Sequence, residues 1–300
     1  MFLANRIFGS NIALFIHSLY DKIRFHLNWS TVAKKTIKIK IPRTHGICKV
    51  SVAPVRRKPD DTSEIVTQLL FGELFTIVSK KNKSWVKIEC EWDNYVGWMD
   101  PKQVQGLTEP EFDTLKENNA YALEVAQPIT FGELSFPILA ASTLPQFDGM
   151  TFTILNQKHF YNGQVLVPDQ VPITAELLVK VAKKYLNAPY LWGGRNPFGI
   201  DCSGFTQCVF KIFGIRLPRD AYQQAELGEM VDFVSSSNVG DLAFFENKEG
   251  RIHHVGIILE DNYIIHASGM VRIDKLDHFG IYHKGKRSYT HTLRFIRRIL

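Results

Sequence analysis

Cysteine is scarce in this sequence, and the spacing of the few cysteines excludes two classes of small domain. The 300 residues contain four, at positions 48, 90, 202 and 208, without the Cys-x-x-Cys spacing that zinc sites favour. Nor do so few cysteines form the framework of a disulfide-rich secreted domain. We therefore expect free thiols and a reducing compartment, which makes the cytoplasm the expected location.

Long apolar runs are also missing. No stretch reaches the length of about 18 residues that a membrane-spanning helix requires, so we expect no membrane span. The stretch "NIALFIHSLY" near the start contains a histidine and is followed by charged residues without a small-residue cleavage site, which makes it a poor signal peptide. Residues 1–45 are interpreted as a loosely docked N-terminal extension or as a mispredicted start. Export to the periplasm or cell surface is the alternative location.

Charge of one sign does not dominate the chain. The 36 basic and 30 acidic residues give a net charge of +6 and are spread along the sequence, unlike the clustered basic footprint of a nucleic-acid-binding protein. We therefore expect no nucleic-acid partner. Because 45% of the 300 residues are apolar, the chain can bury more than one core, and two or three domains are expected.

The first half of the chain contains many short strand-like runs. Residues 46–107 include "CKVSVAPV", "ELFTIVSK", "SWVKIEC" and "YVGWMD", separated by polar turn segments. This pattern predicts a small all-β barrel. Residues 108–172 repeat the pattern more weakly, with turn signals such as Asp148-Gly149 and Asn162-Gly163, and predict a second barrel of similar size.

The pattern changes near residue 173, where a third domain covering residues 173–300 is expected to begin. The segment "TAELLVKVAKKYLN" has helical apolar spacing with Thr174 as a cap. A second helix is predicted over "DCSGFTQCVFKIFG", capped by Asp201 and ended by Gly214. Later runs, among them "DLAFFEN", "HHVGIILE" and "NYIIHASG", read as strands. We therefore predict helices packed on an antiparallel sheet.

The two cysteines of the second predicted helix have different surroundings. Cys208 shares an apolar stripe with Phe205, Val209 and Ile212, which is typical of a buried structural thiol. Cys202 begins the helix, where the positive end of the helix dipole favours the nucleophilic thiolate over the thiol. From the residues alone, a nucleophile and a structural thiol are equally good interpretations of Cys202.

A nucleophilic cysteine needs a base, and two histidines on consecutive predicted strands are candidates. A three-residue loop between the strands would pair Leu259 with Tyr263 and make His254 a diagonal neighbour of His266 on one face. A two-residue turn would place these histidines on opposite faces. Strand histidines are often structural, and the alternation of the strand does not choose between His254 and His253.

Six motifs of the last domain resemble, in order and spacing, those of the NlpC/P60 family of papain-like cysteine peptidases: "YLWGG", "DCSGF", "LPRDAYQQ", "GDLAFF", "HHVGIIL" and "IIHASG". The resemblance spans residues 175–300 and implies an α+β papain-like catalytic domain, preceded here by two small all-β SH3-like barrels. By position, Cys202 matches the family nucleophile, His254 the base and His266 the polar residue that orients the base. Tyr190 matches the tyrosine beside the nucleophile.

The mechanism that this resemblance implies needs no metal and no cofactor. Cys202 attacks an amide carbonyl, His254 takes and returns the proton, and His266 holds the tautomer of His254. Backbone N–H groups at the helix start, with the Tyr190 hydroxyl, stabilise the oxyanion.

The paired SH3-like barrels resemble those of the family subgroup that trims murein peptides with a free N-terminal L-Ala. That subgroup cuts the bond from γ-D-glutamate to a diamino acid, diaminopimelate or lysine, which implies a murein peptide substrate and a role in cell-wall peptide recycling. Asp220 matches the acid that holds the free amine, although Asp220 with Gln223 also forms an ordinary helix capping box.

Four further residues are candidates for the wall of the substrate pocket. Glu64 and Tyr95 of the first barrel resemble the residues that close its other side, and a surface acid and a strand aromatic are equally good interpretations. Asp201 and Ser203 flank the nucleophile, although capping alone explains Asp201.

Three other function classes are compatible with parts of this pattern. An exported enzyme that cuts polymeric wall would use the barrels as wall-binding modules. A binding protein with an inactive catalytic domain would not need Cys202, His254 and His266 together. An acyltransferase of related fold needs a lipid-facing apolar segment near the nucleophile, which "RNPFGID" does not provide.

Overall fold

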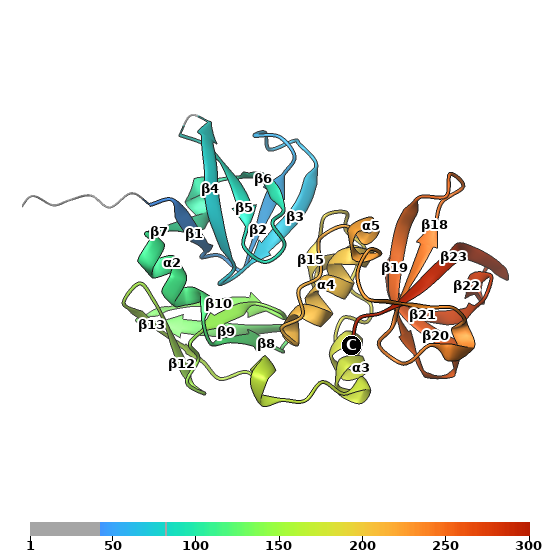
Figure 1. Cartoon of the computed structure of the whole chain (residues 1–300). Helices are drawn as coiled ribbons and strands as arrows, with labels where there is room; N and C mark the ends of the chain where they lie inside the picture. Colours follow the sequence, from blue (N-terminus) through green and yellow to red (C-terminus); the bar gives the residue numbers. More distant parts are fainter. Residues whose placement is uncertain (1–42, 82) are drawn as a thin grey trace, which may run out of the picture. The chain divides into compact units, whose positions relative to one another are not determined.

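The computed structural model describes residues 43–81 and 83–300 (Figure 1). The predicted N-terminal extension, residues 1–45, lies outside these described residues except for its last three positions. In the part of the chain that is described, no helix is both long enough and apolar enough to cross a bilayer.

The first all-β region is an antiparallel sheet of seven strands in the order β3-β2-β6-β5-β4-β1-β7. In β5, Val86, Ile88 and Cys90 are buried and alternate with half-buried residues, which is the period-2 pattern of a strand with one face in the core. This region was predicted as all-β, and the prediction is confirmed. Its elements are β1 His45–Cys48, β2 Val52–Arg56, β3 Ile65–Leu70, β4 Leu74–Lys81, β5 Trp85–Cys90, β6 Val96–Met99, the 3-10 helix η1 Pro101–Gln103 and β7 Val104–Leu107.

A second region opens with a helix that the sequence analysis did not predict, α2 at Glu109–Lys116. The signals were present, because Thr108 and Glu111 form a capping box and the buried Phe112 and Leu115 are three residues apart. Two small antiparallel sheets follow, in the orders β10-β9-β13-β12 and β11-β8-β14. Their strands are β8 Asn119–Ala122, β9 Ala126–Phe131, β10 Leu134–Leu139, β11 Thr143–Pro145, β12 Thr151–Ile154, β13 Gln157–Tyr161 and β14 Val165–Leu166, followed by η2 Pro168–Gln170.

The last region combines helices with a closed antiparallel sheet. The predicted helices are confirmed as α3 and α4, and the sheet order is β17-β23-β18-β19-β20-β21-β22, where β23 also pairs with β22 and closes six strands into a barrel. The elements are α3 Ala175–Lys183, β15 Arg195–Asn196, β16 Gly199–Ile200, α4 Cys202–Ile212, α5 Ala221–Gln224, β17 Glu229–Val231, η3 Val234–Ser236, β18 Leu242–Glu246, β19 Ile252–Leu259, η4 Glu260–Asn262, β20 Tyr263–Ser268, β21 Met270–Asp277, β22 Gly280–His283 and β23 Ser288–Arg298.

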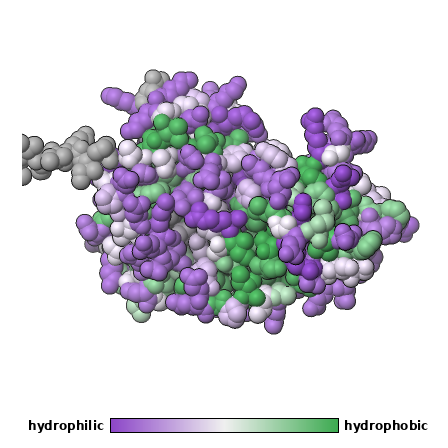
Figure 2. Space-filling view, viewed as in Figure 1, coloured by the Kyte–Doolittle hydropathy of each residue, from purple (hydrophilic) through white to green (hydrophobic). Residues whose placement is uncertain are grey.

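Helix α4 is the central element of the last region, because all of its residues are buried. It contacts α3, β19 and β20, and also β8 of the second region, and its buried polar residues Thr206, Gln207 and Lys211 are hydrogen-bonded to other elements. Cys208 lies in this core together with Phe205, Val209 and Ile212, which confirms its interpretation as a structural thiol. On the face drawn in Figure 2, hydrophobic residues gather toward the middle of the view among hydrophilic ones.

The hairpin of β19 and β20 has the register of the three-residue loop, which is one of the two alternatives that the sequence left open. Leu259 pairs with Tyr263 and Gly256 pairs with His266, so the three-residue loop forms and His254 is diagonal to His266. The alternation of the strands places both histidines on the face of Ile258, which packs inside the closed sheet. The hairpin therefore fixes the two imidazoles next to each other.

Candidate active site

Eight of the nine site residues predicted from the sequence line one cavity of about 600 Å³. The last region and the first all-β region both contribute to its wall. From the last region come Tyr190, Asp201, Cys202, Ser203, Asp220 and His254, and from the first come Glu64 and Tyr95. The ninth residue, His266, is 1% exposed and hydrogen-bonded to His254. The structure thus brings all nine together.

Cys202 begins α4 directly after the capping residue. Asp201 accepts a hydrogen bond from the N–H of Gly204 at 2.7 Å, which fixes the start of the helix. We predicted that this position would favour the thiolate, but the burial of the side chain opposes this effect. Cys202 is 6% exposed, and its burial, followed by the negative charge of Asp201, raises its pKa to about 12. The loss of hydration outweighs the helix start, so the resting group is the thiol.

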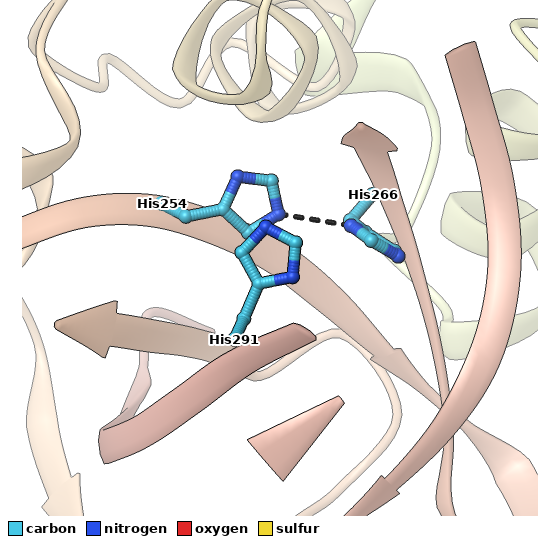
Figure 3. A group of neighbouring side chains, drawn as sticks. All are labelled: His254, His266 and His291. Atoms are coloured by element: carbon cyan, nitrogen blue, oxygen red, sulfur yellow. Dashed lines mark hydrogen bonds between the residues drawn. The ribbon is translucent and has the colours of Figure 1, made fainter. Parts of the chain in front are cut away.

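Two histidines and an aspartate form a hydrogen-bonded chain behind the cavity. The Nε2 atom of His254 lies 2.9 Å from Nδ1 of His266, and Nε2 of His266 lies 3.1 Å from Oδ2 of Asp274 (Figure 3). The carboxylate of Asp274 can only accept, so His266 donates from Nε2 and accepts at Nδ1 from His254. This assignment leaves the lone pair of His254 on Nδ1, and Figure 3 shows Nδ1 on the side away from His266.

Both histidines are held in the neutral form. Burial lowers the pKa of His254 well below its usual value, and the neighbouring His266 lowers it further. Burial also lowers the pKa of His266, although the bond to Asp274 opposes this shift. A neutral thiol and a neutral imidazole therefore face the same cavity, and His254 can act as a general base at neutral pH.

Asp201 and Ser203 line the cavity but are occupied by contacts within the protein. The two oxygens of Asp201 accept hydrogen bonds from Arg219 at 3.0 and 2.6 Å, and Oδ2 also accepts from the N–H of Gly193 at 2.8 Å. Arg219 donates to the hydroxyl of Ser203 at 2.9 Å. These hydrogen bonds hold the loop before α4 against the start of the helix, and they thereby stabilise the wall of the cavity.

Gly193 allows this loop to approach the first all-β region. Its φ is +77°, and a Cβ at this position would lie 2.2 Å from the carbonyl oxygen of Ile65 in β3. Any larger residue would therefore push the loop away from the strand. Tyr190 on the same loop lies at the cavity together with Cys202, and burial raises the pKa of its hydroxyl.

At the other side of the cavity, Asp220 meets the first all-β region. The Tyr95 hydroxyl lies 3.3 Å from Oδ2 of Asp220, and burial raises the pKa of Asp220. Glu64 accepts hydrogen bonds from Arg57 at 3.1 Å and from the indole of Trp192 at 2.8 Å, and these bonds, that of Arg57 first, lower the pKa of Glu64. The Nζ, Nη and Nε atoms of the described residues form no ion pair with Asp220.

Several residues of this site were missed in the sequence. A tight turn at Gly269 makes Arg272 the partner of His266 and places Asp274 on the same face, so the run "HASGMVRID" could have identified Asp274. His291, whose ring stacks on that of His254 with centroids 4.2 Å apart, comes from β23 and was not predictable by local pattern. The pairing of Arg219 with Asp201 likewise depends on tertiary packing.

The chain is similar to known proteins over both halves. A model described as the NlpC/P60 family matches residues 187–292, and one described as the bacterial dipeptidyl-peptidase SH3 domain matches residues 55–104. A gamma-D-glutamyl-L-lysine dipeptidyl-peptidase of Bacillus cereus is 30% identical over 236 residues, covering 69% of this chain and 68% of that protein. The protein of the same name from Bacillus subtilis is 30% identical over 222 residues, covering 68% of this chain and 72% of that protein.

A solved structure is similar over most of the chain. The crystal structure of an NlpC/P60 family protein from Bacillus cereus has a TM-score of 0.73 at 26% identity, and the match covers 85% of this chain and 99% of that one. The fold and the matches define a peptidase, a hydrolase with an SH3-like all-β region ahead of its catalytic domain. The chain belongs to the NlpC/P60 family.

Proposed function

We propose that this protein hydrolyses the bond between γ-D-glutamate and an L-diamino acid, lysine or diaminopimelate, in murein peptides that have a free N-terminal L-Ala. The observation that carries the proposal is that the carboxylate of Asp220 forms no ion pair with the described residues. Three carboxylates line the cavity, and two of them pair with arginines, Glu64 with Arg57 and Asp201 with Arg219. Asp220 has no such partner among the described residues, so it is available to a cationic group of the substrate.

The surroundings of Asp220 favour a substrate ammonium group. Its carboxylate is half-buried, and burial raises its pKa, so an arriving cation restores favourable interactions that water no longer supplies. The Tyr95 hydroxyl adds a second polar contact from the first barrel. The names of the two Bacillus relatives, which are gamma-D-glutamyl-L-lysine dipeptidyl-peptidases, support a substrate with its free amine two residues from the cut bond.

The chemistry follows from the neutral thiol and imidazole. His254 takes the proton of Cys202 as the sulfur attacks the carbonyl carbon, and returns it to the leaving amine of the diamino acid. A water molecule, deprotonated by His254, then releases the acyl group from Cys202. The oxyanion is stabilised by N–H groups in the first turn of α4 and by the Tyr190 hydroxyl, each such donor contributing about 3 kcal/mol. His266 and Asp274 hold the tautomer of His254.

The proposal extends to the second region and to the cellular location. We infer that α2 and the strands β8 to β14 form a second SH3-like domain, which their two small antiparallel sheets support. We also infer action in the cytoplasm on recycled peptides, supported by four free cysteines. If intact wall is the better substrate, we would conclude that the enzyme is exported and acts on polymeric wall.

The proposal is tested by identifying the products. The full chain is incubated with L-Ala-γ-D-Glu-L-Lys, with the corresponding diaminopimelate peptide and with intact murein, and the products are followed by mass spectrometry. We expect L-Ala-γ-D-Glu and the free diamino acid from the short peptides. Cys202→Ala should abolish hydrolysis without loss of folding, and the matched control Cys208→Ala should retain it. Turnover by the Cys202 variant, or a cut at another bond, would overturn the proposal.

A further inference from the structure

Three imidazoles from three strands meet at the inner wall of the cavity. His254 comes from β19, His266 from β20 and His291 from β23, and each offers a ring nitrogen within 4.8 Å of the other two (Figure 3). The proposed reaction uses His254 and His266 and leaves His291 without a role. We propose that His254, His266 and His291 form a binding site for Zn²⁺, and that Zn²⁺ inhibits the enzyme by occupying it.

The hydrogen bonds around the three rings leave a suitable lone pair on His266 and on His291, and His254 offers its Nε2 after a change of tautomer. Nε2 of His266 is bonded to Asp274, which directs its Nδ1 lone pair toward His254. A carboxylate behind a ligating histidine is the arrangement that orients zinc ligands and makes them more basic. Nδ1 of His291 lies 2.9 Å from the hydroxyl of Thr290, so its Nε2 is free, and Figure 3 shows this nitrogen beside His254.

Binding at His254 requires one proton to move. The Nε2 atom of His254 donates to Nδ1 of His266, so the proton shifts to Nδ1 of His254 when the metal takes the Nε2 lone pair.

The geometry fits a tetrahedral site after a small adjustment. With zinc-to-nitrogen bonds of about 2.0 to 2.1 Å, ligand nitrogens lie about 3.4 Å apart. The nitrogens of His254 and His266, now 2.9 Å apart, would separate slightly, and His291, which is less buried, would move inward. All three rings are reached from the cavity or lie directly behind it, which provides an entry path and a fourth position for water.

Zinc bound in this way removes the base of the reaction. The metal holds Nε2 of His254 and shifts the proton of that ring to Nδ1, so Nδ1 can no longer accept the proton of Cys202, and the hydrogen bond between His254 and His266 is lost. The inhibition rests on the proposed peptidase function, whereas the binding of the metal does not. Metal binding and inhibition can therefore be tested separately.

Binding is tested on the full-length Cys202→Ala protein, because the variant has no thiol at the nucleophile position to chelate the metal. Zn²⁺ is titrated by calorimetry, and Co²⁺ is used as a second probe for the visible absorption of a tetrahedral site. We expect one equivalent to bind. His291→Phe, which keeps a stacked ring but removes the nitrogens, should weaken binding by about tenfold or more. The matched control His253→Phe alters the exposed neighbour of His291 and should leave binding unchanged.

Inhibition is then measured on proteins with Cys202 intact. Zn²⁺ should inhibit peptide hydrolysis, and a chelator should restore it. His291→Phe should raise the zinc concentration that gives half-inhibition by about tenfold, with the inhibition measured relative to the variant's own zinc-free rate. No binding to the Cys202→Ala protein, or equal weakening by His253→Phe and His291→Phe, would overturn the site. Binding without inhibition would overturn its regulatory role. A protein inactive on every peptide would sink the proposed function, and the titrations would still decide the metal site.

Discussion

His254 and His266 are expected to contribute unequally to hydrolysis. In the proposed reaction His254 accepts the proton of Cys202, so His254→Ala should reduce kcat/KM nearly as much as removing Cys202, because residues that act as one unit are not additive. His266→Ala removes only the group that orients His254, and measurable activity should remain. Steady-state rates on the diaminopimelate peptide, with circular dichroism melts as the folding control, check this order. Equal activity of the two variants would contradict it.

The resting state of Cys202 predicts an unusual pH dependence for its alkylation. Burial and Asp201 raise its pKa to about 12, so the thiolate fraction is small at neutral pH and grows about tenfold with each pH unit below the pKa. The rate of alkylation by iodoacetamide should therefore keep rising from about pH 7 to about pH 10. Cys202→Ala provides the background from the other thiols. A plateau with an apparent pKa below 7 would instead indicate a preformed thiolate and imidazolium pair.

The charge of Asp220 should affect the hydrolysis of substrates with a free amine and not that of other substrates. Asp220→Asn keeps a helix-capping side chain but loses the charge, so kcat/KM for the free-amine peptide should fall by about tenfold or more, while that for the N-acetylated peptide changes little. Gln223→Ala is the matched control, because it removes the bond of Gln223 to the backbone of Asp220 and leaves the carboxylate in place. Equal losses on both peptides would mark Asp220 as structural.

Between elements, a buried charge cluster joins the first all-β region to strand β15 and helix α4. Glu73, which follows β3, is bonded to Arg195 at 2.8 and 2.9 Å and to Lys211 of α4. Burial raises the pKa of Glu73, but the charges of Arg195 and Lys211 outweigh it and lower the pKa to about 2. Glu73→Gln would leave two buried cations without a counter-charge and should lower the free energy of unfolding by about 3 to 5 kcal/mol.

The same cluster predicts a pH window. A carboxylate with a lowered pKa stabilises the fold above its unfolded value of 4.5 and stops doing so as the pH falls toward about 2. The wild type should therefore lose more stability than Glu73→Gln over this window, as measured by urea unfolding. Glu91→Gln is the control, since the partly exposed pair of Glu91 with Arg216 also links the two regions and should contribute about 1 kcal/mol or less. A loss for Glu73→Gln no larger than for Glu91→Gln would refute the account.

The sequence predicts helix starts and hairpin loops where the signal lies within a few residues. Thr174 and Asp201 cap the predicted helices, and the three-residue loop fixes the register of β19 and β20, because each depends on neighbours a few residues away. The strand β22 and the closure of the sheet through β23 were not predicted, since they depend on pairing between distant segments. The same holds for Glu73, whose partners lie 122 and 138 residues along the chain. The raised pKa of Cys202 depends on burial, which no local pattern reveals.

At the scale of the whole molecule, the cavity depends on two regions of the chain. The catalytic domain supplies Cys202 and His254, and the first barrel supplies Tyr95 and Glu64 on the opposite side. In the proposed function, a substrate that reaches Cys202 has its amino end next to Asp220 and the first all-β region. The account predicts that the barrel acts as part of the specificity pocket and that blocked amino ends are excluded.

The most direct test compares one peptide in two forms. L-Ala-γ-D-Glu-diaminopimelate and its N-acetylated form are given to the wild-type protein, and kcat/KM is determined for each by mass spectrometry of the released diaminopimelate. The account predicts that the free-amine peptide is preferred by about tenfold or more, because only its ammonium group pairs with Asp220. An acetylated peptide that is cleaved equally well or better would contradict the account and favour an enzyme that acts on polymeric wall.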